Sequence, residues 1–183
     1  MSRILTHPPH LPGPGPGRPE AVAVVAFGAN LGDREKTIRD AAERIARLPL
    51  VYEVTLSPLH ETVALTLNGP DPDAPGYVNA VALVTTRLAP AILLGMLHAI
   101  EDENGRERHE RWGDRTLDLD LIAYGDETST DPQVLLPHPR AFERLFVLEP
   151  WLDLDPDAVL PGYGRVADLA ANLAAELRRQ EDI

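Results

Sequence analysis

An unbroken apolar run rich in valine, AVAVVAF at residues 21–27, is the feature that most constrains the fold of this chain. The run ends at Gly28, and short apolar runs closed by glycine are typical of buried strands. The spacing of apolar residues then changes to a helical period. A buried strand followed at once by an amphipathic helix indicates a domain that mixes the two kinds of element.

The turn between them, GANLGD, contains two glycines that could suggest a phosphate-binding loop. That loop needs a glycine directly before its lysine, whereas Glu35 precedes Lys36, the only lysine of the chain. We therefore interpret Gly28 and Gly32 as parts of a tight strand-to-helix turn. Asp33 is the expected N-cap of the helix.

The same alternation of strands and helices continues along the chain. Further elements are predicted as strands over 51–58, 60–65, 77–88 and 117–124, a helix from Pro90, and a last helix near 165–179. The short strand at 60–65 extends the one before it or pairs with it. Residues 66–76 are predicted to be a polar loop without regular structure. This order predicts an α+β fold, a ferredoxin-like sandwich with a mostly antiparallel sheet flanked by helices.

The length of 183 residues suits one domain, and the N-terminal segment differs from the rest. Residues 8–19 read PPHLPGPGPGRP, so we expect residues 1–20 to form a flexible Pro/Gly-rich tail. The globular domain is predicted over 21–183. Its 44% hydrophobic and 25% charged residues are close to the globular average.

The charge balance and the absence of cysteine exclude several classes of function. A net charge of −12 disfavours binding to nucleic acid or to anionic membranes. A chain without cysteine has no disulfides, thiolate zinc sites or thiol nucleophiles. No apolar run approaches the roughly 20 residues needed to cross a bilayer, and the start lacks a signal-peptide pattern. We expect a cytoplasmic monomer without nucleic-acid or membrane partners.

The segment RWGDRTLDLDLIAYGD, residues 111–126, carries the most specific chemistry. Side chains alternate along a strand, so Asp118 and Asp120 share one face, and the other face is expected to hold Leu117, Leu119, Leu121 and Ala123. Two carboxylates at this spacing can hold Mg²⁺ together with substrate phosphates. The alternative is an amphipathic strand with a solvated acidic face.

The residues before the strand favour the metal-binding interpretation. Four arginines and a tryptophan occur within ten positions: Arg106, Arg108, Arg111, Trp112 and Arg115. Arginine pairs with phosphate oxygens, and an indole can stack on a flat ring. Phosphate-binding arginines beside metal-binding aspartates are what phosphoryl transfer from a nucleotide requires. We expect this arginine-rich segment to move until a nucleotide supplies counter-charge.

Together with VAFGANLGD (25–33), GYVNAVALVTT (76–86) and LPHPRAFERLFVLEPW (136–151), this segment resembles the 6-hydroxymethyl-7,8-dihydropterin pyrophosphokinase family. The resemblance covers nearly the whole predicted domain. It implies the transfer of pyrophosphate from ATP to the hydroxymethyl group of the pterin, which yields AMP, with two Mg²⁺ ions. The acceptor hydroxyl would attack the β-phosphorus of ATP.

The resemblance also implies roles for individual residues. Asp118 and Asp120 would bind the metal ions and act in catalysis with Arg106 and Arg115. The implied ATP-binding residues are Glu101, Arg106, Arg108, Trp112, Arg115, His138 and Arg144. The implied pterin-binding residues are Thr62, Leu65, Tyr77, Asn79, Trp112 and Phe146. The chain departs from the usual family pattern at Val63, Asp114, Gln133 and Pro139.

Each of several residues also has a structural interpretation. Asn79 could form a strand-end turn, Phe146 could belong only to the core, Glu101 could be a solvated helix charge, and His138 between two prolines could make a rigid turn. Two other functions compete with the enzyme: a non-catalytic binding module on the same fold, and an RNA-binding ferredoxin-like domain.

Overall fold

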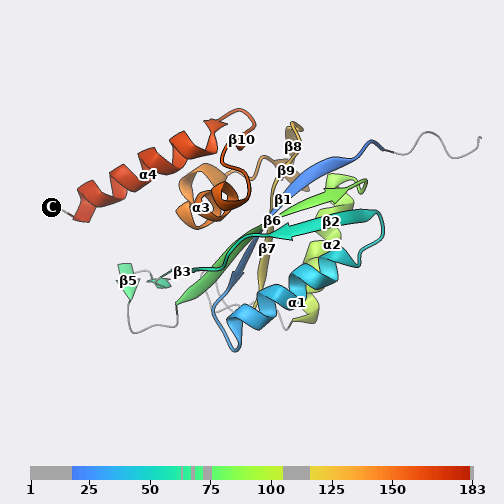
Figure 1. Cartoon of the computed structure of the whole chain (residues 1–183), viewed down its shortest axis with the longest axis horizontal. Helices are drawn as coiled ribbons and strands as arrows, with labels where there is room; N and C mark the ends of the chain where they lie inside the picture. Colours follow the sequence, from blue (N-terminus) through green and yellow to red (C-terminus); the bar gives the residue numbers. More distant parts are fainter. Residues whose placement is uncertain (1–17, 63, 67–68, 72–75, 105–115, 182–183) are drawn as a thin grey trace, which may run out of the picture.

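The computed structural model describes residues 18–62, 64–66, 69–71, 76–104 and 116–181 (Figure 1). Most of the predicted tail lies outside these residues. The described part of the tail contacts the domain, because Arg18 forms an ion pair with Glu127.

One antiparallel sheet organises the domain. The apolar run forms β1 (Ala21–Ala29) in the middle of the sheet, between β6 (Tyr77–Thr86) and β7 (Asp118–Tyr124). β2 (Val51–Leu56) pairs with the far side of β6, so the strand order is β2-β6-β1-β7. β3 (His60–Thr62) continues along the same edge of β6, so the expectation that it extends β2 is confirmed, whereas the alternative that it pairs with β2 is not.

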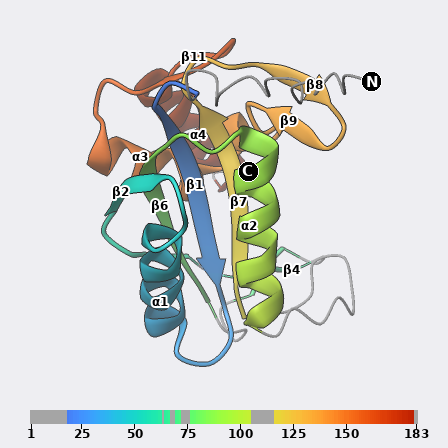
Figure 2. The same cartoon turned by 90° about the vertical axis from the view of Figure 1, so that its right-hand side faces the viewer.

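Helices cover both faces of this sheet, as Figure 2 shows. α1 (Arg34–Ala46) and α2 (Pro90–Glu103) lie on one face, and α3 (Leu145–Leu154) and α4 (Val166–Glu181) lie on the other. The predicted α+β, ferredoxin-like sandwich is confirmed. In the part of the chain that the structure describes, none of the helices has the length and apolar character needed to cross a membrane.

Short elements connect the main ones. They are the hairpins β4 (Ala64–Thr66) with β5 (Gly69–Asp71), β8 (Ser129–Asp131) with β9 (Val134–Leu136), and β10 (Val159–Leu160) with β11 (Gly164–Arg165), and the 3-10 helix η1 (Ala141–Glu143). The first hairpin corrects the prediction that residues 66–76 lack regular structure. Such a hairpin is formed by main-chain hydrogen bonds, and the pattern of hydrophobic residues does not predict these bonds.

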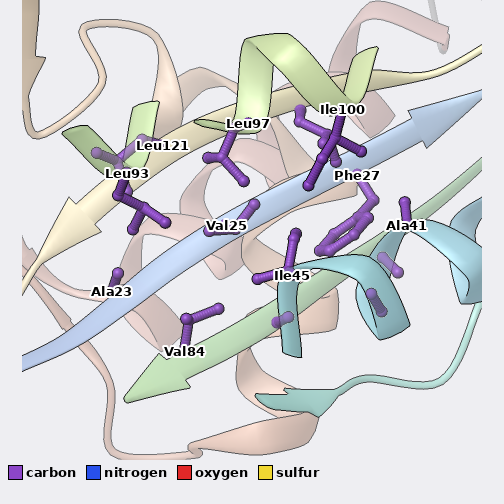
Figure 3. Close-up of a cluster of buried hydrophobic side chains, with 14 of the residues drawn as sticks. Ala23, Val25, Phe27, Ala41, Ile45, Val84, Leu93, Leu97, Ile100 and Leu121 are labelled. Carbon is purple, nitrogen blue, oxygen red and sulfur yellow. The ribbon is translucent and has the colours of Figure 1, made fainter. Parts of the chain in front are cut away.

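Burial on both faces explains why the apolar run is unbroken. Ala23, Val25 and Phe27 point into the core beneath α1 and α2 (Figure 3), whereas Val24 and Ala26 point into the core beneath α3 and α4. Successive side chains of a strand point to opposite faces, so a strand between two cores needs apolar residues at every position.

A β-bulge interrupts the alternation of β7. The register with β1 passes from Leu121 to Ala123 and leaves Ile122 as an extra residue. Ala123 therefore faces the α3–α4 core, not the face of Leu121 as predicted. Tyr124 returns to the α1–α2 core, where its buried hydroxyl donates to the Leu88 carbonyl at 2.5 Å.

Candidate active site

Three neighbouring strands place two candidate functional side chains on one face of the sheet. Gly28 of β1 pairs with Asn79 of β6 on one side and with Asp118 of β7 on the other. A Cβ at Gly28 would lie 3.6 Å from Asn79 Oδ1 and 3.9 Å from Asp118 Cβ. Gly28 is thus a strand residue, which corrects its assignment to the turn. Gly32, with φ of 65°, is the glycine that the turn requires.

Asp118 and Asp120 share the α3–α4 face, as the alternation predicted. Leu119 between them is buried in the opposite core. The Asp120 side chain is 31% exposed, and its Oδ2 accepts a hydrogen bond from Arg144 Nη1 at 2.9 Å. His138 Nε2 lies 4.0 Å from the other carboxylate oxygen of Asp120. Asp120 therefore meets two side chains from the segment after β9.

The main chain fixes the position of His138. It follows a cis Leu136–Pro137 peptide, and its backbone N–H donates to the carbonyl of Ile122, the bulge residue, at 2.8 Å. Its Nδ1 accepts from the backbone N–H of Arg140 at 3.2 Å. The rigid-turn interpretation is therefore correct for the backbone, while the side chain still reaches Asp120.

The environment favours the neutral form of His138. Burial lowers the pKa of the imidazole below its ordinary value, and the nearby Arg144 and Arg140 lower it further, against the opposing effect of Asp120 and Asp118. Since Nδ1 accepts a hydrogen bond, the proton of the neutral ring is on Nε2. His138 therefore directs an N–H group toward the carboxylate side of the site.

The start of α3 supplies two further side chains, although no helix was predicted there. Arg144 is the residue before the helix, and its guanidinium carbon lies 5.7 Å from the centre of the Phe146 ring. Phe146 is half-buried and packs against the α3–α4 core. The core interpretation of Phe146 is thus correct in part, and the ring also lies beside the arginine that binds Asp120.

On the other side of Gly28, β3 and β6 bring Thr62, Tyr77 and Asn79 together. Thr62 pairs with Tyr77 in the register, and Asn79 Nδ2 donates to Thr62 Oγ1 at 2.8 Å. Asn79 is buried inside β6, so the strand-end interpretation is wrong. Leu65 lies in β4, and its side chain is not among those described.

Glu101 is the most buried charged residue named for the site. Its side chain on α2 is only 1% exposed, and Oε1 accepts from the backbone N–H of Leu119 at 2.9 Å. The solvated-charge interpretation is therefore wrong. This bond fixes β7 at the residue between Asp118 and Asp120, so Glu101 supports the strand that carries both carboxylates.

Arg106, Arg108, Trp112 and Arg115 lie in segment 105–115, outside the described residues. The expectation that this segment moves before nucleotide binds also remains a prediction. Among the described residues, the charged side chains placed at the site are Asp118, Asp120, Arg144 and Glu101.

The donor set of β7 fits Mg²⁺. Asp118 and Asp120 offer carboxylate oxygens on one partly exposed face, and hard divalent cations prefer oxygen ligands. Mg²⁺ is typically held by one or two carboxylates together with phosphate oxygens and water. Two aspartates flanked by a guanidinium and an imidazole N–H are therefore suited to a metal–phosphate complex.

This fold and this site define an α+β enzyme of the phosphoryl-transfer class. The sequence matches the family model described as 7,8-dihydro-6-hydroxymethylpterin-pyrophosphokinase over residues 24–156. The chain belongs to this family. It is a diphosphotransferase of folate biosynthesis that uses ATP to pyrophosphorylate hydroxymethyldihydropterin.

Curated relatives agree with the family assignment. The 2-amino-4-hydroxy-6-hydroxymethyldihydropteridine pyrophosphokinase of Pseudomonas aeruginosa is 43% identical over 147 residues, which cover 80% of this chain and 88% of that protein. The enzyme of the same name from Haemophilus influenzae is 38% identical over 152 residues, covering 83% of this chain and 92% of the relative.

Solved structures support the fold. The crystal structure of Plasmodium falciparum HPPK-DHPS with pteroate superimposes with a TM-score of 0.68 at 14% sequence identity. The match covers 92% of this chain and 45% of that one, so this chain spans less than half of the Plasmodium protein. At this identity the similarity concerns the fold alone.

Proposed function

We propose that the pyrophosphoryl group is transferred across Gly28, with the pterin on the side of Asn79 and the metal-bound phosphates on the side of Asp118. The observation that carries this proposal is the register that puts these three residues side by side on one face. Because Gly28 has no side chain, the face between the two polar groups stays flat.

Asp118 and Asp120 would hold the metal, which we propose to be two Mg²⁺ ions. Bound Mg²⁺ supplies neutralisation of the phosphate charges of ATP and polarisation of the phosphorus that is attacked. Glu101 keeps the carboxylates in place through its bond to Leu119, so we assign it as a positioning residue of the nucleotide half of the site.

The basic groups of the site would bind phosphate oxygens. Arg144 presents a guanidinium fixed against Asp120, and His138 presents its Nε2–H as a neutral donor. We propose that Arg106, Arg108 and Arg115 contribute further charge to the nucleotide. Such donors stabilise charge that develops on the leaving AMP.

The acceptor half would bind a flat heterocycle. Thr62 accepts from the Asn79 amide nitrogen and thereby leaves the amide oxygen for a ring N–H. We propose that Phe146 stacks against the pterin, with Tyr77, Leu65 and Trp112 completing the pocket. A pocket made this way orients the hydroxymethyl group toward Asp118.

From the sequence alone we further propose that the enzyme acts as a cytoplasmic monomer. An acidic chain of this composition, a member of a family whose substrates are small molecules, supports this proposal. Analytical ultracentrifugation of the purified full chain at several concentrations measures its mass in solution and so tests the proposed monomeric state.

The function is tested by supplying MgATP and 6-hydroxymethyl-7,8-dihydropterin and separating the nucleotide products. AMP and pterin pyrophosphate should appear in equal amounts, and stoichiometric ADP would refute the proposed transfer. Asp118→Asn and Asp120→Asn should each lose about 10³-fold or more in turnover. Asp126→Asn, an exposed aspartate just after β7, is the matched control and should stay near the wild-type rate.

A further inference from the structure

Arg34 is the first residue of α1 and carries none of the roles described above. A helix N-terminus favours anions, so a cation in the first turn gains nothing from the helix dipole. The presence of an arginine at this position must therefore be explained by the contacts of its side chain.

The guanidinium of Arg34 joins two segments that are distant in sequence. Nη1 donates to the Gly76 carbonyl at 2.5 Å, and Nη2 donates to Glu61 Oε1 at 3.2 Å. Glu61 belongs to β3, and Gly76 directly precedes β6. The chain leaves β3 at Thr62 and enters β6 at Tyr77, so Arg34 links the two ends of the acceptor-side segment.

At this point the two ends approach each other closely. A Cβ on Gly76 would lie 2.8 Å from the carbonyl oxygen of Thr62, a distance that real side chains do not adopt. Only glycine allows the backbone before β6 to lie this near to Thr62. The bond from Arg34 to the Gly76 carbonyl holds the chain in this position.

Arg34 acts from the face opposite to the acceptor site. Glu61 pairs with Val78, whose side chain lies in the α1–α2 core, so Glu61 is on that face. Thr62, Tyr77 and Asn79 alternate to the other face, where Gly28 and Asp118 lie. Arg34 can therefore affect a bound pterin only through the backbone that carries these residues.

We propose that Arg34 is a positioning residue for the pterin acceptor, because it fixes Thr62 and, through Thr62, the orientation of the Asn79 amide. This inference rests on the proposed acceptor site. A guanidinium can bond the carbonyl and the carboxylate at the same time, whereas an ammonium is a single point charge. The carbonyl bond should matter more, since Glu61 is 72% exposed and its ion pair is weakened by water.

The test measures binding of 6-hydroxymethyl-7,8-dihydropterin by calorimetry without nucleotide. Arg34→Ala should raise the pterin Kd about tenfold, the scale of one charge-assisted hydrogen bond. Arg34→Lys should raise it less, and Glu61→Gln least. The Kd of the enzyme for a methylene analogue of ATP, measured in the presence of Mg²⁺, should stay within about twofold of wild type. The kcat at saturating pterin should also stay within about twofold.

Arg39→Ala is the matched control, because Arg39 lies on the same helix and pairs with Glu35 of that helix at 3.5 Å. It should leave both affinities unchanged. Arg34→Gln replaces the alanine variant if the latter does not fold. An unchanged pterin Kd, or an equal loss of pterin and nucleotide affinity, overturns the proposal.

Pterin binding by Asn79→Ala distinguishes a failure of the proposed role of Arg34 from a failure of the proposed acceptor site. If Asn79→Ala loses pterin binding while Arg34→Ala and Arg34→Gln bind normally, only the role of Arg34 is wrong. If Asn79→Ala and Arg34→Ala both bind pterin like wild type, the proposed acceptor site itself is wrong.

Discussion

Asn79 and Asp118 lie in register on the two sides of Gly28, one strand away from it in each direction. Adjacent strands are about 4.8 Å apart, so the backbones of the two residues are roughly 10 Å apart. A group bound at Asn79, as we propose for the pterin, would thus place its reacting atom near a metal ion bound at Asp118. The sheet itself sets the spacing between the two halves of the site.

Gly28→Val should reduce activity without unfolding the protein. A Cβ fits between Asn79 and Asp118 at ordinary contact distances, but the additional methyl groups of valine would occupy the space between them. We expect at least a tenfold loss of kcat/KM for the pterin, with unfolding free energy within about 1 kcal/mol of wild type because valine favours strands. Steady-state kinetics and urea unfolding measure the two quantities.

Gly95→Ala on α2 is the control for Gly28. A Cβ there meets no heavy atom within 4 Å. The substitution should leave activity unchanged and stabilise the helix by up to about 1 kcal/mol. Wild-type kinetics in Gly28→Val would refute the proposed path over this residue.

Arg144→Met should change the affinities for free metal and for nucleotide in opposite directions. Arg144 is bonded to Asp120, so its removal frees a carboxylate oxygen and should strengthen Mg²⁺ binding in the absence of nucleotide. The same change removes the cation that we propose binds phosphate, and should weaken binding of the magnesium–ATP analogue about tenfold or more. Calorimetric titrations measure both.

Arg140→Met serves as the comparison, because Arg140 is half-exposed and pairs with Glu143 at 3.5 Å. It should alter each affinity by less than about twofold. A parallel fall of both affinities in Arg144→Met would show that the residue does not compete with the metal for Asp120.

Glu101→Ala should destabilise the protein by about 1–3 kcal/mol, because it leaves the buried Leu119 N–H without its acceptor. Glu101→Gln keeps an acceptor oxygen and should cost less. Urea unfolding measures both variants. Glu103→Ala, at a position 67% exposed on the same helix, should change stability by less than about 1 kcal/mol, and an equal effect at both positions would contradict the assigned role.

The nucleotide-free protein should lose stability as the pH falls below the ordinary histidine pKa, in part through His138. Burial holds the pKa of His138 below its unfolded value, so the unfolded chain takes up the proton first as the pH falls. The stability that this residue contributes is present above an unfolded pKa of about 6.5 and is lost as the pH falls toward the folded pKa.

Thermal unfolding of wild type and His138→Asn between pH 7.5 and 5 tests this prediction. The variant should show a flatter pH dependence. His98→Asn, an exposed position on α2, should retain the wild-type slope. A slope unaffected by His138→Asn would exclude this linkage.

The periodicity of hydrophobic residues predicted the elements that have one face in the core and the other in solvent. It missed α3, because LFVLEPWLDL is apolar on nearly all sides and contains Pro150, which disfavours an interior helix position. It also failed at Ala123, because one bulged residue reverses the alternation and leaves no signal in residue type.

The placement of Asp118 and Asp120 on one face was predictable, because their spacing along one strand determines it. Arg34 was missed because its partners, a carbonyl and an exposed carboxylate, lie 42 and 27 residues away. Burial of Glu101 did have a signal, since position 101 follows Leu97 by four residues and continues the buried stripe of α2.

Because of the bulge at Ile122, β7 should not tolerate the insertion or deletion of a residue. If that residue were deleted, one end of the strand would have to rotate to the opposite face. Either the two carboxylates would enter the core beneath α2, at the cost of burying unpaired charge, or Tyr124 would leave its position on the Leu88 carbonyl. The Ile122 carbonyl also accepts the His138 N–H, so an insertion or deletion in this strand would displace His138 and disturb the packing of the core at the same time.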